Sequence, residues 1–418
     1  MIYDVVIIGG GPAGIMSAIQ ASELGVRVVL LEKNNDLGVK LLITGHGRCN
    51  ITNMMADSKE KINVYGKNFK FLFSVLNKFS VSDTITFFKN IGIDTRVEDN
   101  YRVFPLSNRA SDVQLALKKY LEKNNVEIMF NTEVKEIIAV GNKIEKVILK
   151  SNKEIFSKNF IICTGGKSYE ATGSTGDGYK WLKKIGHTII KPRPALAPII
   201  VEEKIVKKLE GLSLKNIEIT VFQNSKKIIS STGEIIFTAN GLSGPAIIDL
   251  SSRIGSLLLA PVILQIDFFP ELESIELEKK LQNDFHHSRN KIFKNYLTSL
   301  VSPKLAPIII ELTNINGLKQ VSAITKEERQ LLVCCFKKFI LKVKELKGFD
   351  KAMITAGGVD VKEVDPKTMR SKLFQNLFLA GEILDLDGPT GGYNLQICWS
   401  TGFVAGESIF KNLHSKNI

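Results

Sequence analysis

The first thirty residues constrain the fold more than any other part of the chain. A short apolar, β-branched run, Tyr3–Ile8, ends in the glycine string Gly9-x-Gly11-x-x-Gly14. Apolar residues at helical spacing follow over residues 13–24, and a second apolar run covers residues 26–31. A strand, a glycine turn, a helix and a strand in this order form a βαβ unit, so the sequence predicts a parallel sheet in an α/β domain.

The glycine string predicts a site for a dinucleotide. Without side chains the backbone can turn tightly and approach a pyrophosphate, and the N-terminus of the next helix supplies free N–H groups and partial positive charge. Glu32 ends the second strand eighteen residues after Gly14, where a carboxylate can accept both ribose hydroxyls of an adenosine. The predicted residues of this part of the site are Gly9, Gly11, Pro12, Ala13, Gly14, Glu32 and Lys33.

Three later strings favour FAD over NAD, although both dinucleotides use the same glycine string. Thr164-Gly165-Gly166 follows an apolar strand and resembles the T-G-G signature of flavoproteins that bind two dinucleotides. Residues 173–178 (GSTGDG) resemble a loop of fumarate-reductase-like flavoenzymes. Gly381-Glu382 follows the strand predicted at 377–379, a pattern in which the acid contacts the ribityl chain of FAD. No second G-x-G-x-x-G follows a strand, so NAD(P)H as a transient reductant is left open.

The pattern of elements changes at Pro192. Three prolines (Pro192, Pro194, Pro198) introduce alternating strands, which indicate an antiparallel β module, and residues 275–339 are mostly helical. Thr325 and Glu328 have the spacing of a capping box, and residues 340–346 nearly alternate, as a strand returning to the β module would. The expected strands of the module are 217–222, 227–230 and 262–267. Outside it we expect helices over 68–90, over 112–123 and after Asn394, and strands at 126–130, 143–150 and 160–163.

Three long strings carry a family resemblance: residues 40–53 (KLLITGHGRCNITN), 238–251 (TANGLSGPAIIDLS) and 355–394. They resemble the bacterial flavoprotein family labelled NAD(P)/FAD-dependent oxidoreductase, which includes aminoacetone-oxidase-like enzymes and bile-acid-inducible reductases acting on enone steroids. The likeness covers essentially the whole chain. Ala239-Asn240 departs from the His and aromatic residue that relatives often carry, which puts a shared substrate in doubt if this pair touches substrate.

The resemblance implies a Rossmann-like FAD/NAD(P)-binding domain of the glutathione-reductase type. This domain is interrupted by an insertion with a β-barrel-like part and a helical part, the layout that the element pattern also predicts. The predicted segments are 1–191 (FAD-binding domain, first part), 192–270 (β-rich insert, first part), 271–339 (helical insert), 340–356 (return strand of the β-rich insert) and 357–418 (FAD-binding domain, second part).

The loop from Gly45 to Asn50 supplies candidate residues for the flavin. Arg48 is expected to pair with a phosphate or to hold the negative charge of the reduced flavin, and Asn50 can both donate to and accept from the flavin edge. Cys49 is either a redox thiol or a small packing residue, and His46 is either a general acid or base or an ordinary turn histidine. Lys40, Gly45 and Val134 complete the predicted cofactor residues of this half of the chain.

The segment before the last helix supplies a second set. Gly391 and Gly392 would let the backbone approach the pyrimidine end of the flavin, where the helix N-terminus stabilises negative charge. Tyr393 either stacks on the ring or fills a gap in the core. Asp385 and Asp387 either bind ribityl hydroxyls or form a turn. The remaining predicted cofactor residues are Gly165, Gly166, Gly381, Glu382 and Asn394. The catalytic candidates are Arg48, Asn50, His46 and Tyr393.

Composition excludes several classes of protein. Fifty-six basic and forty-three acidic residues give a net charge of +13, but only ten of the basic residues are Arg and the Lys are scattered, so we do not expect nucleic acid as a partner. Five cysteines without a C-x-x-C pair predict no metal site and a reducing compartment. No signal peptide or stretch long enough to span a bilayer is present, which predicts a cytoplasmic protein with no membrane partner.

The resulting hypothesis is an FAD-dependent oxidoreductase that transfers a hydride between flavin N5 and a small organic substrate. A flavin-dependent amine oxidase that uses dioxygen is the nearest alternative. An RNA-modifying flavoprotein and a flavin-binding redox sensor without turnover are two others. The sequence names neither the substrate nor the oligomeric state.

Overall fold

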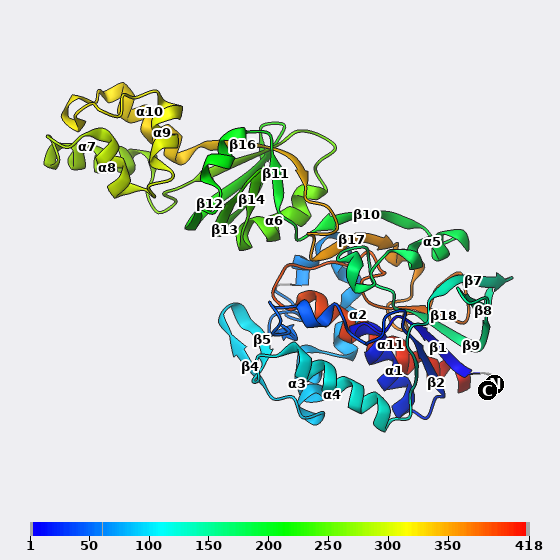
Figure 1. The fold of residues 1–418 in the computed structure, drawn as a ribbon. Coiled ribbons are helices and arrows are strands. Elements are labelled where there is room, and N and C mark those ends of the chain that lie inside the picture. Colours follow the sequence, from blue (N-terminus) through cyan, green and yellow to red (C-terminus); the bar gives the residue numbers. More distant parts are fainter. Residues whose placement is uncertain (1–2, 61, 415–418) are drawn as a thin grey trace. The chain divides into compact units, whose positions relative to one another are not determined.

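The computed structural model describes residues 3–60 and 62–414. The chain divides into two compact units, Met1–Pro194 together with Ala352–Ile418, and Ala195–Lys351 (Figure 1). Each unit is described by itself. The finer five-segment division of the chain stays a prediction.

The first unit is built on a sheet whose central strands are parallel. Its order is β6-β2-β1-β9-β8-β7, and β18 pairs with β9. Both β1 and β2 are buried almost throughout, which is why they read as continuous apolar runs. The strands are β1 (Tyr3–Ile8), β2 (Val28–Leu31), β6 (Glu127–Met129), β7 (Val134–Val140), β8 (Lys143–Leu149), β9 (Glu154–Ile162) and β18 (Leu377–Leu379).

Two helices from opposite ends of the chain pack closely against each other in this unit. They are α1 (Pro12–Glu23) and α11 (Tyr393–His414). A Cβ added to Gly402 would lie 2.5 Å from the carbonyl oxygen of Ala13, and one on Gly406 would lie 2.5 Å from that of Ser17. The Ser17 hydroxyl donates to the carbonyl of Gly402 at 3.0 Å. Small residues on both helices therefore allow the two backbones to touch.

The helical region predicted over residues 68–90 consists of two helices. They are α2 (Phe69–Lys78) and α3 (Val81–Asn90). Ser80 lies between them in an extended conformation, its hydroxyl accepts from the N–H of Asp83, and the Asp83 carboxylate accepts from the N–H of Ser80. This capping box begins a new helix, so it interrupts a periodicity that otherwise looks unbroken.

Smaller elements complete the first unit. A three-stranded antiparallel sheet has the order β3-β5-β4, and β10 pairs with β17. The bounds of these elements are β3 (Thr52–Asn53), β4 (Thr95–Glu98), β5 (Arg102–Pro105), α4 (Ala110–Lys123), α5 (Asp177–Lys184), β10 (Ile189–Ala195) and β17 (Ile354–Val359). The short 3-10 turns are η1 (Leu41–Ile43), η2 (Ile62–Asn68), η3 (Asp99–Tyr101), η4 (Glu170–Thr172) and η7 (Val361–Glu363).

The second unit contains a closed antiparallel barrel of order β11-β14-β13-β12-β15-β16. Alternate side chains of its strands are buried, for example Val262, Leu264 and Ile266 of β15. The return strand predicted at 340–346 is β16 and closes the barrel against β11. Its strands are β11 (Ile199–Val201), β12 (Ser213–Gln223), β13 (Lys226–Thr238), β14 (Gly241–Ser243), β15 (Val262–Asp267) and β16 (Phe339–Leu346).

The same unit carries a helical part, as predicted. The capping box of Thr325 and Glu328 is present at the start of α10. The helices are α6 (Pro245–Gly255), α7 (Ser274–His287), α8 (Phe293–Leu300), α9 (Ala306–Thr313) and α10 (Lys326–Lys337), with 3-10 turns η5 (Lys204–Leu209) and η6 (Val321–Ala323). A Rossmann-like domain interrupted by a barrel and a helical part is thus the observed fold. None of the helices described is both long and apolar enough to cross a membrane.

Candidate functional site

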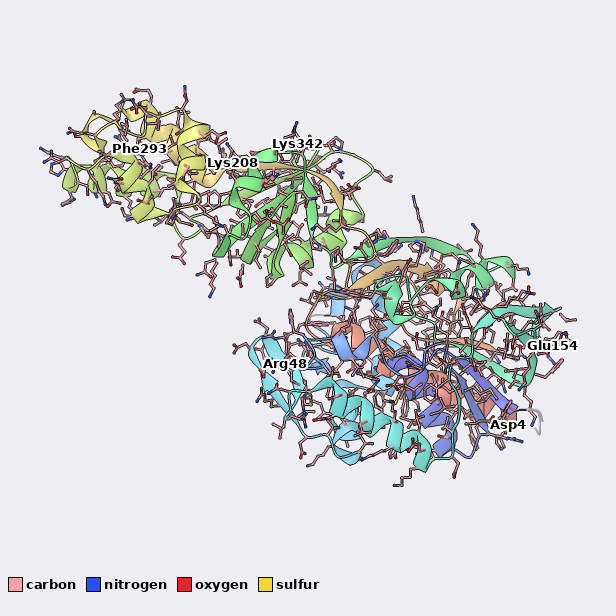
Figure 2. The ribbon with its side chains drawn as sticks, viewed as in Figure 1. Asp4, Arg48, Glu154, Lys208, Phe293 and Lys342 are labelled. Atoms are coloured by element: carbon pink, nitrogen blue, oxygen red, sulfur yellow. The ribbon has the colours of Figure 1, made fainter. Side chains whose placement is uncertain are left out.

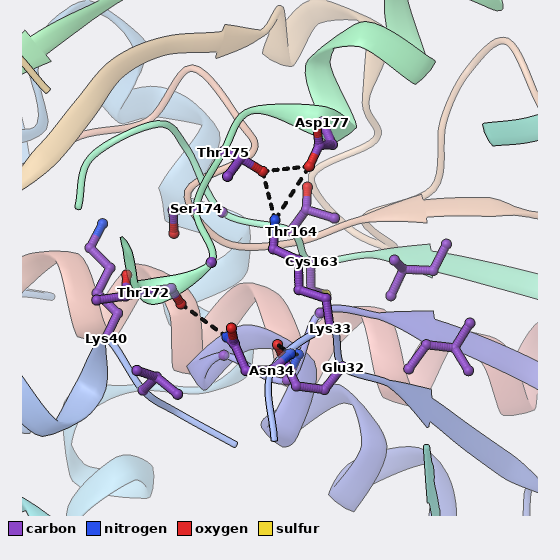
Figure 3. A pocket seen from close by; sticks show the side chains of 18 of the residues that line it. Glu32, Lys33, Asn34, Lys40, Cys163, Thr164, Thr172, Ser174, Thr175 and Asp177 are labelled. Atoms are coloured by element: carbon purple, nitrogen blue, oxygen red, sulfur yellow. Dashed lines mark hydrogen bonds and ion pairs between the residues drawn. The ribbon is translucent and has the colours of Figure 1, made fainter. Parts of the chain in front are cut away.

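A cleft opens at the carboxyl ends of the parallel strands of the first unit (Figure 3). Open α/β sheets bind ligands at this edge. The loops after β1, β2 and β9 all contribute, and the segment 172–177 covers one side. Eleven predicted cofactor residues line the cleft: Gly9, Gly11, Pro12, Ala13, Glu32, Lys33, Lys40, Val134, Thr164, Gly165 and Glu382.

The three glycines of the first turn serve two different purposes. A Cβ on Gly9 would lie 2.5 Å from the carbonyl oxygen of Cys163, and one on Gly14 would overlap the carbonyl oxygen of Gly9. Gly9 and Gly14 are therefore required by the packing of the protein itself. A Cβ on Gly11 would have no atom within 4 Å, because it would point into open space. At Gly11 the missing side chain leaves room for a ligand.

Glu32 is held in place by backbone groups before any ligand binds. It is buried, its Oε2 accepts from the N–H of Gly10 at 2.7 Å, and its Oε1 accepts from the N–H of Asn34 at 2.8 Å. Each oxygen has further lone-pair capacity for a ribose hydroxyl. The carboxylate is thus pre-oriented at the end of β2, where the sequence predicts a ribose ligand.

Glu382 joins four separate segments at the cleft. Its Oε2 accepts from Lys40 Nζ at 2.9 Å, and its Oε1 accepts from the Ser168 hydroxyl at 3.1 Å and from the N–H of Thr355 at 2.7 Å. Lys40 also donates to the Ser168 hydroxyl at 2.7 Å. Two predicted cofactor residues, Lys40 and Glu382, are therefore in contact. Neither Ser168 nor Thr355 was identified as a site residue from the sequence. The one sequence feature that pointed to either is that Thr355 opens one of the family strings.

Among the buried side-chain atoms that lack a hydrogen-bond partner within the described residues, two belong to predicted cofactor residues. They are Asn50 Oδ1 and Thr164 Oγ1, and Asn50 is 8% exposed. A buried acceptor without a donor costs free energy, so such atoms indicate a missing ligand. FAD carries both an imide N–H and several hydroxyl groups that can donate. With the open space at Gly11 and the oriented Glu32, these atoms fit FAD.

Arg48 is already paired within the protein. Its side chain, labelled in Figure 2, forms an ion pair with Glu98 and donates to Asn108 Oδ1 at 2.8 Å. The guanidinium also lies 4.0 Å from the ring centre of Phe104. The Arg48 guanidinium holds the pKa of Glu98 below its usual range, so the pair is ionised. Pairing of Arg48 with a flavin or a phosphate stays a prediction, and it would compete with Glu98.

The rest of the 45–50 loop is strained and mostly packed. Gly45, His46, Gly47 and Cys49 all have positive φ, and such strain clusters at functional sites. Cys49 is completely buried, and burial raises the pKa of its thiol to about 12. Burial therefore disfavours a thiolate at neutral pH, which favours the packing interpretation of Cys49. His46 is exposed.

The segment 388–394 is fixed by contacts within the protein. Asn394 Oδ1 accepts from the N–H of Gly388 at 2.9 Å, and Asn53 Nδ2 donates to the carbonyl of Gly391 at 2.9 Å. A Cβ on Gly392 would overlap the backbone of Thr52. Tyr393 is buried edge-to-face against Tyr65, with ring centres 5.7 Å apart, which favours the core-filling interpretation. Contact of this segment with the flavin stays a prediction.

Twelve predicted cofactor residues do not line the cleft. Gly14 and Gly381 pack against residues that do line it. A Cβ on Gly14 would overlap the carbonyl oxygen of Gly9, and one on Gly381 would lie 2.7 Å from that of Ala13. Asp385 is buried and paired with Lys67 at 3.1 Å and Asn68 at 2.9 Å. The twelve are Gly14, Gly45, Arg48, Cys49, Asn50, Gly166, Gly381, Asp385, Gly391, Gly392, Tyr393 and Asn394.

Within the described part of the chain, Asp387 and Arg193 form a second group outside the lining of the cleft. Asp387 is half-buried, and Arg193 Nε is buried without a hydrogen-bond acceptor. Burial raises the pKa of Asp387 to about 6; Arg193 and Lys67 oppose this rise, and Asp385 and Glu382 reinforce it. Sequence reasoning missed Arg193, since nothing in its surroundings marks it.

A buried Ser–His–Glu arrangement lies elsewhere in this unit. His187 Nδ1 is 2.8 Å from Glu363 Oε2, and His187 Nε2 is 3.0 Å from the hydroxyl of Ser371. The Ser371 oxygen also accepts from the N–H groups of Leu373 and Phe374, both at 3.1 Å, and Ser371 is 3% exposed. An oxygen so enclosed cannot attack a substrate, so the arrangement is a structural clamp. No cluster of His, Cys, Asp and Glu suited to a metal occurs in the described residues.

The profile of the HI0933-like protein Rossmann domain matches residues 3–408. The chain belongs to the HI0933-like family. Over 407 residues it is 31% identical to the 3-dehydro-bile acid delta(4,6)-reductase of Clostridium scindens, covering 96% of this chain and 98% of that protein. It is 29% identical to the ribosomal RNA dihydrouridine synthase of Haemophilus influenzae, covering 97% and 98%.

Solved structures share the fold of this HI0933-like protein. A flavocytochrome c3 fumarate reductase in its open conformation has a TM-score of 0.52 at 15% identity, over 99% of this chain and 78% of that one. The 3-ketosteroid delta1-dehydrogenase of Sterolibacterium denitrificans has a TM-score of 0.51 at 11% identity, over 98% and 99%. The predicted class, an FAD-dependent oxidoreductase with a Rossmann-type domain, is confirmed.

Replacing Glu32 by alanine is expected to weaken FAD binding in this HI0933-like protein by about 1–3 kcal/mol, because two ribose hydroxyls lose their acceptor. The change also frees the N–H groups of Gly10 and Asn34. FAD fluorescence during titration of the apoprotein measures the affinity, and Glu32→Gln, which keeps one acceptor oxygen, should lie between the two. Equal affinity in all three proteins would show that Glu32 is not the ribose ligand.

Proposed function

We propose that this protein reduces a carbon–carbon double bond conjugated with a carbonyl group. The observation that carries the proposal is its end-to-end similarity to two reductive enzymes. One is named for the delta(4,6) double bonds of a 3-keto bile acid, and the other forms dihydrouridine, which is uridine saturated beside a ring carbonyl. The two substrates differ in size and class, yet the bond that is reduced has the same electronic character.

The protein's own residues perform the positioning. When bound, FAD supplies a hydride to the carbon at the far end of the conjugated system. The N-terminus of α1 and the space at Gly11 would hold the pyrophosphate, and Glu32 would hold the ribose. The Lys40–Glu382 pair also borders the cleft, and Asn50 Oδ1, outside the cleft lining, would accept a hydrogen bond from a donor group of the cofactor. Holding the hydride donor and the acceptor carbon in position contributes to catalysis.

We assign the proton that completes the reduction to Asp387. The carbon next to the carbonyl must gain a proton after hydride arrives, and a carboxyl group with a raised pKa can donate it. Asp385, two residues earlier, is paired with Lys67 and Asn68, whereas Asp387 has no such partners in the described chain. The neighbouring Arg193 is a cation suited to a developing negative charge on the carbonyl oxygen.

A small conjugated ketone is the substrate that we propose first, because the bile-acid reductase is the more similar relative of the two. A uracil ring within ribosomal RNA is the second candidate, favoured by the net charge of +13 together with the synthase similarity. NADH or NADPH is the proposed reductant of the flavin.

Anaerobic stopped-flow spectroscopy of the purified yellow protein tests the function. NADH or NADPH should bleach the flavin, and a 4-en-3-one steroid should then restore its colour and yield a product with two more hydrogens by mass spectrometry. Restoration by an unmodified ribosomal RNA transcript alone would favour the RNA candidate. Bleaching by a primary amine, with recovery only in dioxygen, would replace the proposal with an amine oxidase.

Asp387→Asn is expected to lower the rate of substrate reduction about 100-fold at pH 6. Because the protonated form is the donor, the wild-type rate should fall as pH rises through about 6, the pKa of Asp387, and the variant should lose this dependence. Stopped-flow rates between pH 5 and 8 measure both effects, and FAD absorbance confirms that the variant retains its cofactor. An unchanged pH profile in the variant would assign the proton to another group.

A further inference from the structure

Residues 172–177 form one wall of the cleft and are tied to the strand end on the opposite side. Lys33 Nζ donates to the hydroxyl of Thr175 at 2.6 Å and lies 3.3 Å from Asp177 Oδ2. Asn34 Nδ2 donates to the carbonyl of Thr172 at 3.1 Å. Figure 3 shows both connections, which join residues more than 130 positions apart. All five residues line the cleft.

The wall can lie this close because of two glycines. Gly173 and Gly176 have φ values of +102° and +76°. A Cβ on Gly173 would lie 2.7 Å from Asn34 Nδ2, and one on Gly176 would lie 2.7 Å from Cγ of Lys167. The backbone of the wall therefore lies at contact distance from Asn34 of the strand end and from Lys167, in a conformation that favours glycine.

The strand end that holds the wall is itself rigid. The carboxylate of Glu32 accepts from the N–H of Asn34, and the carbonyl of Asn34 accepts from the N–H of Asn131 at 3.0 Å. Lys33 lies between these two anchored residues, so its side chain projects from a fixed base. By contrast, the wall itself connects η4 to α5 through positive-φ glycines. The two sides therefore differ: the strand end is anchored at both neighbours of Lys33, whereas the wall is held to it by the Lys33 and Asn34 side chains.

The Lys33–Asp177 ion pair helps to stabilise the charged form of Asp177 in the wall. The hydroxyl of Thr175 and the ammonium groups of Lys180 and Lys33 outweigh the opposing effect of burial and hold the pKa of Asp177 below its usual range. Lys33 and Asp177 side chains are each 25% exposed, whereas Lys180, which reaches the same carboxylate at 3.2 Å, is 75% exposed. The Lys33 contact is the less screened of the two.

We propose that Lys33 and Asn34 are positioning residues that keep the 172–177 wall closed over the adenosine end of the cleft, so that the wall must open whenever FAD enters or leaves. The proposal rests on FAD as the cofactor and is independent of the substrate. It predicts a kinetic signature, because a contact within the protein that limits opening slows entry and exit alike. A residue that touches FAD directly changes exit far more than entry.

The test compares rate constants for FAD in matched variants. Apoprotein is mixed with FAD for association, and holoprotein with excess apoflavodoxin as a trap for dissociation, both followed by flavin fluorescence. Lys33→Met removes the less exposed ammonium partner of Asp177, and Lys180→Met removes the more exposed partner of the same carboxylate. We expect Lys33→Met to raise both rate constants about tenfold, Asn34→Ala to raise both, and Lys180→Met to change neither.

Three outcomes decide the proposal. Rescue by Lys33→Arg, which restores a cation of similar reach, would support a closing contact. A rise in the dissociation rate alone, of the kind expected for Glu32→Ala, would make Lys33 a direct ligand of FAD and overturn the proposal. Equal effects of Lys33→Met and Lys180→Met would also overturn it, since the charge of Asp177 and not the closure would then matter. None of these readouts depends on turnover.

Discussion

Replacing Gly11 by alanine is expected to remove most FAD binding and leave the fold intact, whereas Gly14→Ala is expected to damage the fold itself. The added methyl group at Gly11 meets no protein atom within 4 Å and occupies the space intended for the pyrophosphate. Gly11 has φ of −80°, which alanine adopts freely, so the apoprotein should be as stable as wild type or about 0.4–1 kcal/mol more stable. The methyl group at Gly14 would overlap the carbonyl oxygen of Gly9 and should cost about 1–3 kcal/mol or more.

Two measurements on the same proteins separate these effects. Thermal unfolding of the apoproteins by circular dichroism reports the fold, and fluorescence titration reports FAD affinity, which we expect to fall about 100-fold in Gly11→Ala. A Gly11→Ala protein with wild-type affinity would mean that the pyrophosphate lies elsewhere. A Gly14→Ala protein with wild-type stability would mean that the turn can widen.

The second large effect is the loss of stability that we expect when acid protonates the His187 clamp, which consists of His187, Glu363 and Ser371. Burial lowers the pKa of His187 below its usual range despite the opposing Glu363, and the His187 contacts help to lower the pKa of Glu363. Both groups bind protons more readily in the unfolded chain. Their contribution to stability is therefore present above pH 6.5 and is lost as the pH falls through the folded-state pKa values of first His187 and then Glu363. The contribution of the clamp to the free energy of unfolding should decline on acidification from about pH 6.5.

His187→Ala should lower the free energy of unfolding by about 2–4 kcal/mol, because Glu363 and Ser371 lose a buried partner. Urea unfolding between pH 5 and 8 measures this loss and its pH dependence. His187→Gln, which bridges without titrating, should flatten the curve, and His46→Gln, an exposed matched control, should not. Equal slopes of the wild-type and His187→Gln curves between pH 5 and 7 would contradict the assignment.

Local features of the fold and the site could be predicted from the sequence because they depend on residues close together along the chain. The structure contains the three predicted from such patterns: the glycine turn, the position of Glu32 and the alternation of the barrel strands. The capping box at Ser80 was also readable from Ser80-x-x-Asp83, but helical periodicity concealed it.

Long-range polar contacts could not be predicted. The Glu382 contacts with Lys40 and Ser168 span 342 and 214 positions, and no spacing rule relates such residues. Arg48 illustrates the same limit for a residue that the sequence assigned to a ligand. Its charge suggested a ligand, but Glu98, fifty positions away, is its partner in the fold. Whether a charged side chain is available for a ligand depends on tertiary neighbours.

The contact between α1 and α11 constrains when the first unit can fold during synthesis. The surface of α1 that receives Gly402 and Gly406 stays uncovered until α11 has been synthesised. Residues 195–351 form a contiguous unit that can fold in the meantime, because domains fold as units during synthesis. Glu382 and Cys398, which line the cleft, are also synthesised after this unit. Truncation of α11 is therefore expected to leave a folded insertion and an incomplete cofactor cleft.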